Sequence, residues 1–160
     1  ATVIGTVSSD EKAALARGAG ADHIVIYTRE DTARRVRELT GGGGVRVVFD
    51  GVGLDTWEAS LDSTGRRGLI VSYGNASAPV TGVNLGILAS KGSLYSTRPT
   101  LFDYYADPAE REAGAARLWQ MIRAGKVKVT IGQTYPLDQA EQAHRDLENR
   151  ATTGSTLLRP

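Results

Sequence analysis

The sequence predicts an α/β protein whose sheet is doubly wound and mostly parallel. Short runs rich in β-branched residues alternate along the chain with segments of helical periodicity. A return to a parallel strand needs a crossover, and the intervening helices provide it. Glycine accounts for 19 of the 160 residues, which is above its usual share of about 7% and indicates many tight turns between these elements.

The strands are expected where β-branched and aromatic residues gather. They span residues 2–7, 23–27, 45–50, 68–73, 92–96 and 156–158, with a brief extended segment at 127–131. In a doubly wound sheet, ligands bind beyond the carboxyl ends of the strands. The residues that follow each strand are therefore the candidates for function.

The helices between these strands have recognisable boundaries or apolar faces. Ser8 and Glu11 have the spacing of a capping box, which places the first helix start at Ser8. The other signals are Gly18 as the stop of that helix; Ala33, Val36 and Leu39 for the second; Trp57 and Leu61 for a short third; Asp107, Pro108 and Gly125 for the fourth; and Ala140, Ala143 and Leu147 for the last. The glycines at residues 41–44 lie between a helix and a strand, so we expect only a turn there.

Composition excludes several classes of function. The 19 Lys and Arg residues nearly balance the 18 Asp and Glu residues, so we expect neither a nucleic-acid nor a membrane partner. Cysteine is absent, which excludes disulfides, thiolate metal sites and cysteine nucleophiles. His23 and His144 are expected to be structural, and no metal site is expected. With no secretory signal and no bilayer-length apolar run, we expect a cytoplasmic protein.

The segment after the first strand carries the clearest binding signal. Ser8 and Ser9 precede a helix N-terminus, whose N–H groups and dipole favour phosphate, and Lys12 adds a positive charge. An acidic residue closing this strand would select NAD, but serines occupy the place. Lys12, Tyr27 and Arg29 could surround a 2′-phosphate instead, which favours NADP. The alternative is that Ser8 only caps the helix and Lys12 is only solvated.

Two further strand ends are candidates for cofactor contact. Gly51 and Val52 follow the third strand in an incomplete G-x-G-x-x-G pattern, which we interpret as a strand end beside the cofactor. Tyr73, Gly74 and Asn75 combine an aromatic ring, a bare backbone and an amide, which suit a planar carboxamide. An ordinary turn with Tyr73 half-buried is the alternative.

Motifs along the whole chain resemble those of one enzyme family. They are residues 5–12 (GTVSSDEK), 45–53 (VRVVFDGVG) with 55–57 (DTW), 71–75 (VSYGN), 81–88 (TGVNLGIL), 92–95 (GSLY) with 97–99 (TRP), and 150–155 (RATTGS). They resemble the zinc-independent, zeta-crystallin-like NADPH:quinone oxidoreductases of the medium-chain dehydrogenase/reductase superfamily. This resemblance covers essentially the whole chain.

The resemblance implies NADPH as cofactor and supplies its contact residues. These are Ser8, Ser9 and Lys12 around the 2′-phosphate, Tyr27 beside it, Gly51 and Val52 near the adenosine, Tyr73, Gly74, Asn75, Pro99, Thr100 and Leu101 near the nicotinamide, and Arg150. It also implies a homodimer in which the strand from Gly92 to Tyr95 pairs across the dimer axis. No catalytic acid or base is implied at these positions.

The resemblance further implies that residues 1–160 form an incomplete Rossmann-type nucleotide-binding domain. The family's first strand and glycine-rich loop, and its GroES-like catalytic domain, would lie outside this chain. The implied function is hydride transfer from NADPH to a quinone or a similar electron-poor acceptor. The alternatives are an enoyl or enone reductase of the same superfamily, and a fragment that only binds NADPH or is inactive.

Overall fold

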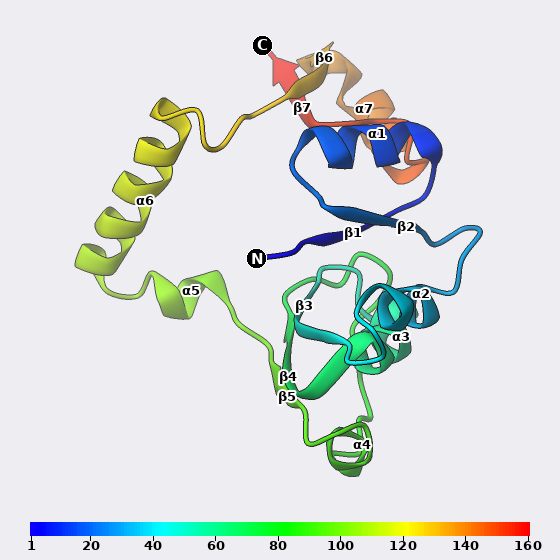
Figure 1. Cartoon of the computed structure of the whole chain (residues 1–160). Helices are drawn as coiled ribbons and strands as arrows, with labels where there is room; N and C mark the ends of the chain where they lie inside the picture. The colour runs from blue at the N-terminus through cyan, green and yellow to red at the C-terminus, as the bar shows by residue number, and fades with distance from the viewer. The chain divides into compact units, whose positions relative to one another are not determined.

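A computed structural model describes residues 1–160, which divide into two compact units, Ala1–Leu101 and Phe102–Pro160. Figure 1 shows the order of the elements along the chain. The strands of the first unit are β1 (Ile4–Val7), β2 (His23–Ile26), β3 (Val45–Asp50), β4 (Thr64–Ser72) and β5 (Tyr95–Thr97). Its helices are α1 (Asp10–Gly18), α2 (Thr32–Leu39), η1 (Leu54–Thr56), α3 (Trp57–Ser63) and α4 (Gly86–Ser90), and α5 (Leu101–Tyr104) begins at its last residue.

Every strand pair of the first unit is parallel, which confirms the predicted α/β fold class. β1 pairs with β2, and β3, β4 and β5 form a second sheet in that order. α1 connects β1 to β2, and η1 with α3 connects β3 to β4, so each return is a helical crossover. β1 and β3 do not pair with each other, and each is the edge strand of its own sheet.

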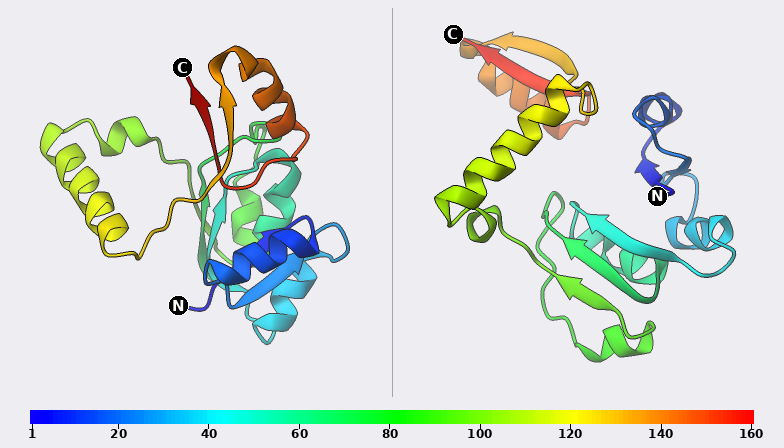
Figure 2. Two further views of the ribbon diagram at one scale, coloured as in Figure 1. Left: turned by 90° about the horizontal axis from the view of Figure 1, so that it is seen from above. Right: turned by 60° about the vertical axis from the view of Figure 1, so that its left-hand side comes forward.

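The core of the first unit lies between α3 and the three-stranded sheet. Leu61 of α3 and Ile70 of β4 are fully buried, and they pack with Leu94 ahead of β5. In Figure 2, α3 lies against one face of the sheet formed by β3, β4 and β5. Side chains alternate along β3, so Asp50 is buried, whereas Phe49 is 73% exposed.

Capping places the start of the first helix one residue later than predicted. Ser9, not Ser8, is the N-cap of α1, and its Oγ accepts a hydrogen bond from the backbone N of Lys12 at 3.3 Å. Asp31 caps α2 and Asp107 caps α6 (Pro108–Arg123) in the same way. The predicted Asp107–Pro108 helix start is therefore confirmed.

Two predicted strands are displaced along the chain. β5 begins at Tyr95 rather than at residue 92, because Gly92 has a φ of 114° and Ser93 a φ of 56°, which leave no extended backbone. β6 (Ile131–Pro136) starts where the predicted extended segment 127–131 ends. The short helices α4 and α5 have no strong periodic signal and were not expected.

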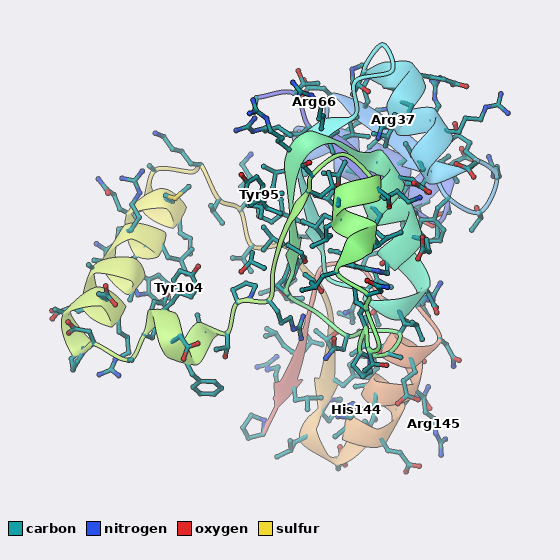
Figure 3. The ribbon with its side chains drawn as sticks, turned by 90° about the horizontal axis from the view of Figure 1, so that it is seen from below. Arg37, Arg66, Tyr95, Tyr104, His144 and Arg145 are labelled. Carbon is teal, nitrogen blue, oxygen red and sulfur yellow. The ribbon has the colours of Figure 1, made fainter.

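The second unit contains α6, β6, η2 (Leu137–Gln139), α7 (Ala140–Glu148) and β7 (Ser155–Arg159). β6 and β7 pair in parallel, with α7 as the crossover. Tyr135 Oη of β6 donates to Asp146 Oδ2 of α7 at 2.7 Å, and Ala143 is the buried residue of that helix. Figure 3 shows the side chains of both units. No helix combines the length and apolar character needed to cross a bilayer.

Candidate functional site

The first group of predicted site residues lies at the carboxyl ends of β1 and β2. Tyr27 N donates to Val7 O at 3.0 Å, and Thr28 Oγ1 donates to Ser8 O at 2.9 Å. The two strand ends are thereby held side by side. Ser8 and Ser9 lie at the start of α1, and the Tyr27 side chain is 44% exposed.

Charged side chains of both signs lie around this group. Lys12 lies in the first turn of α1, where the helix dipole also favours negative charge. Asp10 of the same turn would oppose an anion, but its carboxylate forms an ion pair with Arg29 at 2.6 Å. Ser8 and Ser9 therefore bring two hydroxyls to this strand end and Lys12 brings a positive charge, while Glu11 is a second carboxylate in the same turn.

The second group lies at the carboxyl ends of β3, β4 and β5. Gly51 and Val52 follow β3, Tyr73, Gly74 and Asn75 follow β4, and Pro99, Thr100 and Leu101 follow β5. The segments after β3 and β4 continue side by side past the sheet. Ser77 N donates to Val52 O at 2.9 Å, and Leu54 N donates to Ala78 O at 3.0 Å.

Two glycines make this close approach possible. A Cβ at Gly74 would overlap the carbonyl oxygen of Gly51 and would lie 2.6 Å from its carbonyl carbon. Gly53 has a φ of 96°, a conformation that L side chains rarely adopt. A Cβ at Gly51 would lie 2.9 Å from Tyr73 Oη, so the ring of Tyr73 extends over Gly51. The ring remains 57% exposed and can offer an aromatic surface to a ligand.

Arg98 joins the end of β5 to the turn after β4. Its Nη1 donates to Ser72 O at 2.8 Å and to Gly74 O at 3.2 Å. In the amide orientation that satisfies both of its polar atoms, Asn75 accepts from Arg98 Nη2 at 3.2 Å. Arg98 therefore fixes the turn that carries Tyr73, Gly74 and Asn75.

Asp50 is the buried ionisable group of this region, with 4% of its surface exposed. Burial alone would raise its pKa, but hydrogen bonds from Ser60, Gly53, Thr56 and Val52 outweigh burial and lower the pKa of Asp50 below its usual value. The carboxylate is therefore ionised at neutral pH. Sequence reasoning did not select Asp50. The signal that could have found it is its place at the end of a strand, directly before Gly-Val-Gly.

The remaining predicted site residue, Arg150, belongs to the second unit. It follows α7 with a φ of 58°, and its N–H donates to Leu147 O at 3.1 Å. Sequence reasoning also missed the Thr28 hydroxyl and left the role of Arg98 open. His23 lies in β2 and His144 in α7, and no group of three or more His, Cys, Asp or Glu residues could hold a metal ion.

Comparison with known proteins identifies the family. Residues 19–158 match the family described as zinc-binding dehydrogenase. The chain belongs to that family. It is 55% identical over 158 residues to a quinone oxidoreductase of Pseudomonas aeruginosa, which confirms the predicted quinone oxidoreductase resemblance. That alignment covers 99% of this chain and 49% of the relative.

Two other relatives extend the comparison. The crystal structure of Escherichia coli quinone oxidoreductase complexed with NADPH superposes with a TM-score of 0.95 at 52% identity, covering 99% of this chain and 49% of that one. A 2-haloacrylate reductase of Burkholderia is 43% identical over 164 residues, which cover 100% of this chain and 48% of that protein. This dehydrogenase chain thus spans about half the length of the relatives that it matches.

Proposed function

We propose that this chain is the NADPH-binding part of a quinone oxidoreductase. The observation that carries the proposal is the grouping of hydroxyls, cations and close-packed glycine turns at the carboxyl ends of parallel strands. The 52% identity to a quinone oxidoreductase solved with NADPH supports the same conclusion. The catalytic GroES-like domain, in this proposal, is encoded outside these residues.

The first group of residues binds the phosphate that distinguishes NADPH from NADH. Ser8 and Ser9 donate hydroxyl hydrogen bonds to the 2′-phosphate, Lys12 supplies a full charge, and Tyr27 lies beside that phosphate. Arg29 neutralises Asp10, so the carboxylate does not repel the phosphate. NADH lacks that phosphate and forgoes these contacts.

The second group orients the rest of the cofactor. Gly51 and Val52 lie along the adenosine side, while Tyr73, Gly74 and Asn75, with Pro99, Thr100 and Leu101, border the nicotinamide. NADPH supplies a hydride when bound; with one proton from solvent, it converts a quinone to its hydroquinone and leaves NADP⁺. The residues of this chain bind and orient the cofactor, and none of them is assigned as an acid or base.

Steady-state quinone reduction by the full-length protein tests this function. We expect NADPH-dependent reduction of a quinone such as 1,4-benzoquinone, with kcat/KM for NADPH at least about tenfold above that for NADH, the size of one charge-assisted contact. Absence of NADPH-dependent turnover, or equal use of the two cofactors, would contradict the proposal.

A second candidate is reduction of an electron-poor alkene, favoured by the 43% identity to a 2-haloacrylate reductase. The cofactor site would be unchanged, and the hydride would pass to the alkene carbon instead of the quinone. Assays with 2-chloroacrylate and a 2-enoyl thioester beside the quinone separate the two, since the substrate with the highest kcat/KM identifies the acceptor class.

We also propose that the protein forms a homodimer through β5. This three-residue strand ends the sheet order β3-β4-β5, so its outer edge has no partner, and Tyr95 on it is 63% exposed. Tyr95→Lys should then convert a dimer to a monomer in analytical ultracentrifugation. A wild-type monomer would contradict this proposal.

The cytoplasmic location remains a prediction, which cell fractionation would test.

A further inference from the structure

Asp50 organises the turn after β3 with its side chain. Its Oδ1 accepts from Val52 N at 2.9 Å, from Gly53 N at 3.0 Å and from Thr56 Oγ1 at 2.8 Å. Its Oδ2 accepts from Ser60 Oγ at 2.7 Å. Val52 and Gly53 belong to the turn itself, Thr56 ends η1, and Ser60 is a buried residue of α3. The carboxylate therefore anchors the turn to the helix that forms the core.

The backbone of the same residue holds the turn after β4. The carbonyl oxygen of Asp50 accepts from Tyr73 N at 2.9 Å and from Gly74 N at 3.3 Å. The two turns that we assign to opposite ends of the cofactor therefore meet at one residue. A shift of Asp50 would displace both turns, because the backbones of Gly51 and Gly74 lie too close together for a Cβ to fit between them.

Resting on the proposed function, we infer that Asp50 is a positioning residue for NADPH. It does not touch the cofactor, but it sets the placement of Gly51 and Val52 relative to Tyr73, Gly74 and Asn75. An ionised carboxylate suits this role because it only accepts hydrogen bonds, and every neighbour within reach is a donor. An amide nitrogen in place of Oδ2 would donate where Oδ2 now accepts, so the Ser60 and Thr56 hydroxyls would have to turn and accept instead.

A matched control separates positioning from general stability. Arg37 of α2 makes a comparable set of bonds near the opposite, amino ends of β3 and β4. It donates to Asp62 O at 2.8 Å, to Gly42 O at 3.0 Å and to Thr64 O at 2.8 Å; Figure 3 labels this side chain. Arg37→Met removes these bonds and leaves every hydrogen bond of Asp50 in place.

The experiment compares wild type, Asp50→Asn and Arg37→Met in the full-length protein. NADPH Kd is measured by fluorescence titration, Tm by thermal unfolding, and KM for NADPH and for quinone in steady state. We expect both variants to lower Tm. Asp50→Asn should raise the Kd and KM for NADPH about tenfold or more and leave the quinone KM within twofold, whereas Arg37→Met should change the NADPH Kd less than about twofold.

Thr56→Val is the milder variant, for use if Asp50→Asn does not fold, because it removes only one donor to the carboxylate. It should raise the NADPH Kd about two- to fivefold. An unchanged NADPH Kd in the folded turn variants, or equal weakening in Arg37→Met, would overturn the role of Asp50 while the proposed function stands. Absence of NADPH binding by the wild type would instead overturn the proposed function and this inference with it.

Discussion

Gly74→Ala is expected to destabilise the protein by roughly 3 to 5 kcal/mol and to abolish NADPH binding. The added Cβ would overlap the carbonyl oxygen of Gly51 and lie 2.7 Å from its Cα. Both groups are backbone, so no side-chain rotation relieves the overlap, and the turns after β3 and β4 must separate. The measurements are denaturant unfolding and NADPH titration of the full-length variant.

Gly18→Ala is the matched control for this substitution. A Cβ at Gly18 meets nothing within 4 Å, and alanine is the better helix former at the end of α1 by about 1 kcal/mol or less. This control should keep wild-type affinity for NADPH and wild-type or slightly higher stability. If Gly74→Ala kept wild-type stability and wild-type NADPH affinity, as expected for Gly18→Ala, the two turns would not approach each other as closely as described.

Lys12→Ala is expected to weaken NADPH binding by about tenfold to a hundredfold, the loss of one charge-assisted contact of about 1.5 to 3 kcal/mol. Binding of NADH should change by less than about twofold, because it has no 2′-phosphate for Lys12 to contact. Isothermal titration of both cofactors against the full-length protein measures the two effects.

Arg17→Ala controls for the loss of positive charge from α1. Arg17 lies in the last turn of the same helix, where the helix dipole favours a positive charge. It is therefore at the opposite end of α1 from Ser8 and Ser9. It should leave both affinities within twofold of wild type. Equal loss of NADPH and NADH affinity in Lys12→Ala would place Lys12 outside the 2′-phosphate site.

Local signals predicted the elements of this chain well. The valine-rich run ahead of Asp50, the Asp107–Pro108 helix start and the alternation of strands with helices all correspond to elements of the structure. These features depend on neighbours within a few residues, which a sequence displays directly. The start of β5 was predicted too early because Ser93 has a left-handed backbone conformation, which is rare for serine and has no sequence signature.

The internal connections of the site could not be predicted in this way. Asp50 finds its partners through a turn and a helix, and Arg98 reaches the carbonyls of Ser72 and Gly74 across 26 and 24 residues. Such contacts depend on strand order and register, which the pattern of apolar and polar residues along the sequence does not specify. Gly51 and Gly74 were candidates from their places at strand ends and from the family resemblance, but their close approach to each other is visible only in the structure.

In the proposed complex, NADPH lies along the carboxyl ends of these strands. A crystal structure of the full-length protein with NADPH tests it most directly. We expect the 2′-phosphate within hydrogen-bond distance of Ser8, Ser9 and Lys12, and the nicotinamide beside Tyr73 and Asn75. A dinucleotide bound away from these strand ends, or one whose 2′-phosphate meets none of those three side chains, would contradict the claim.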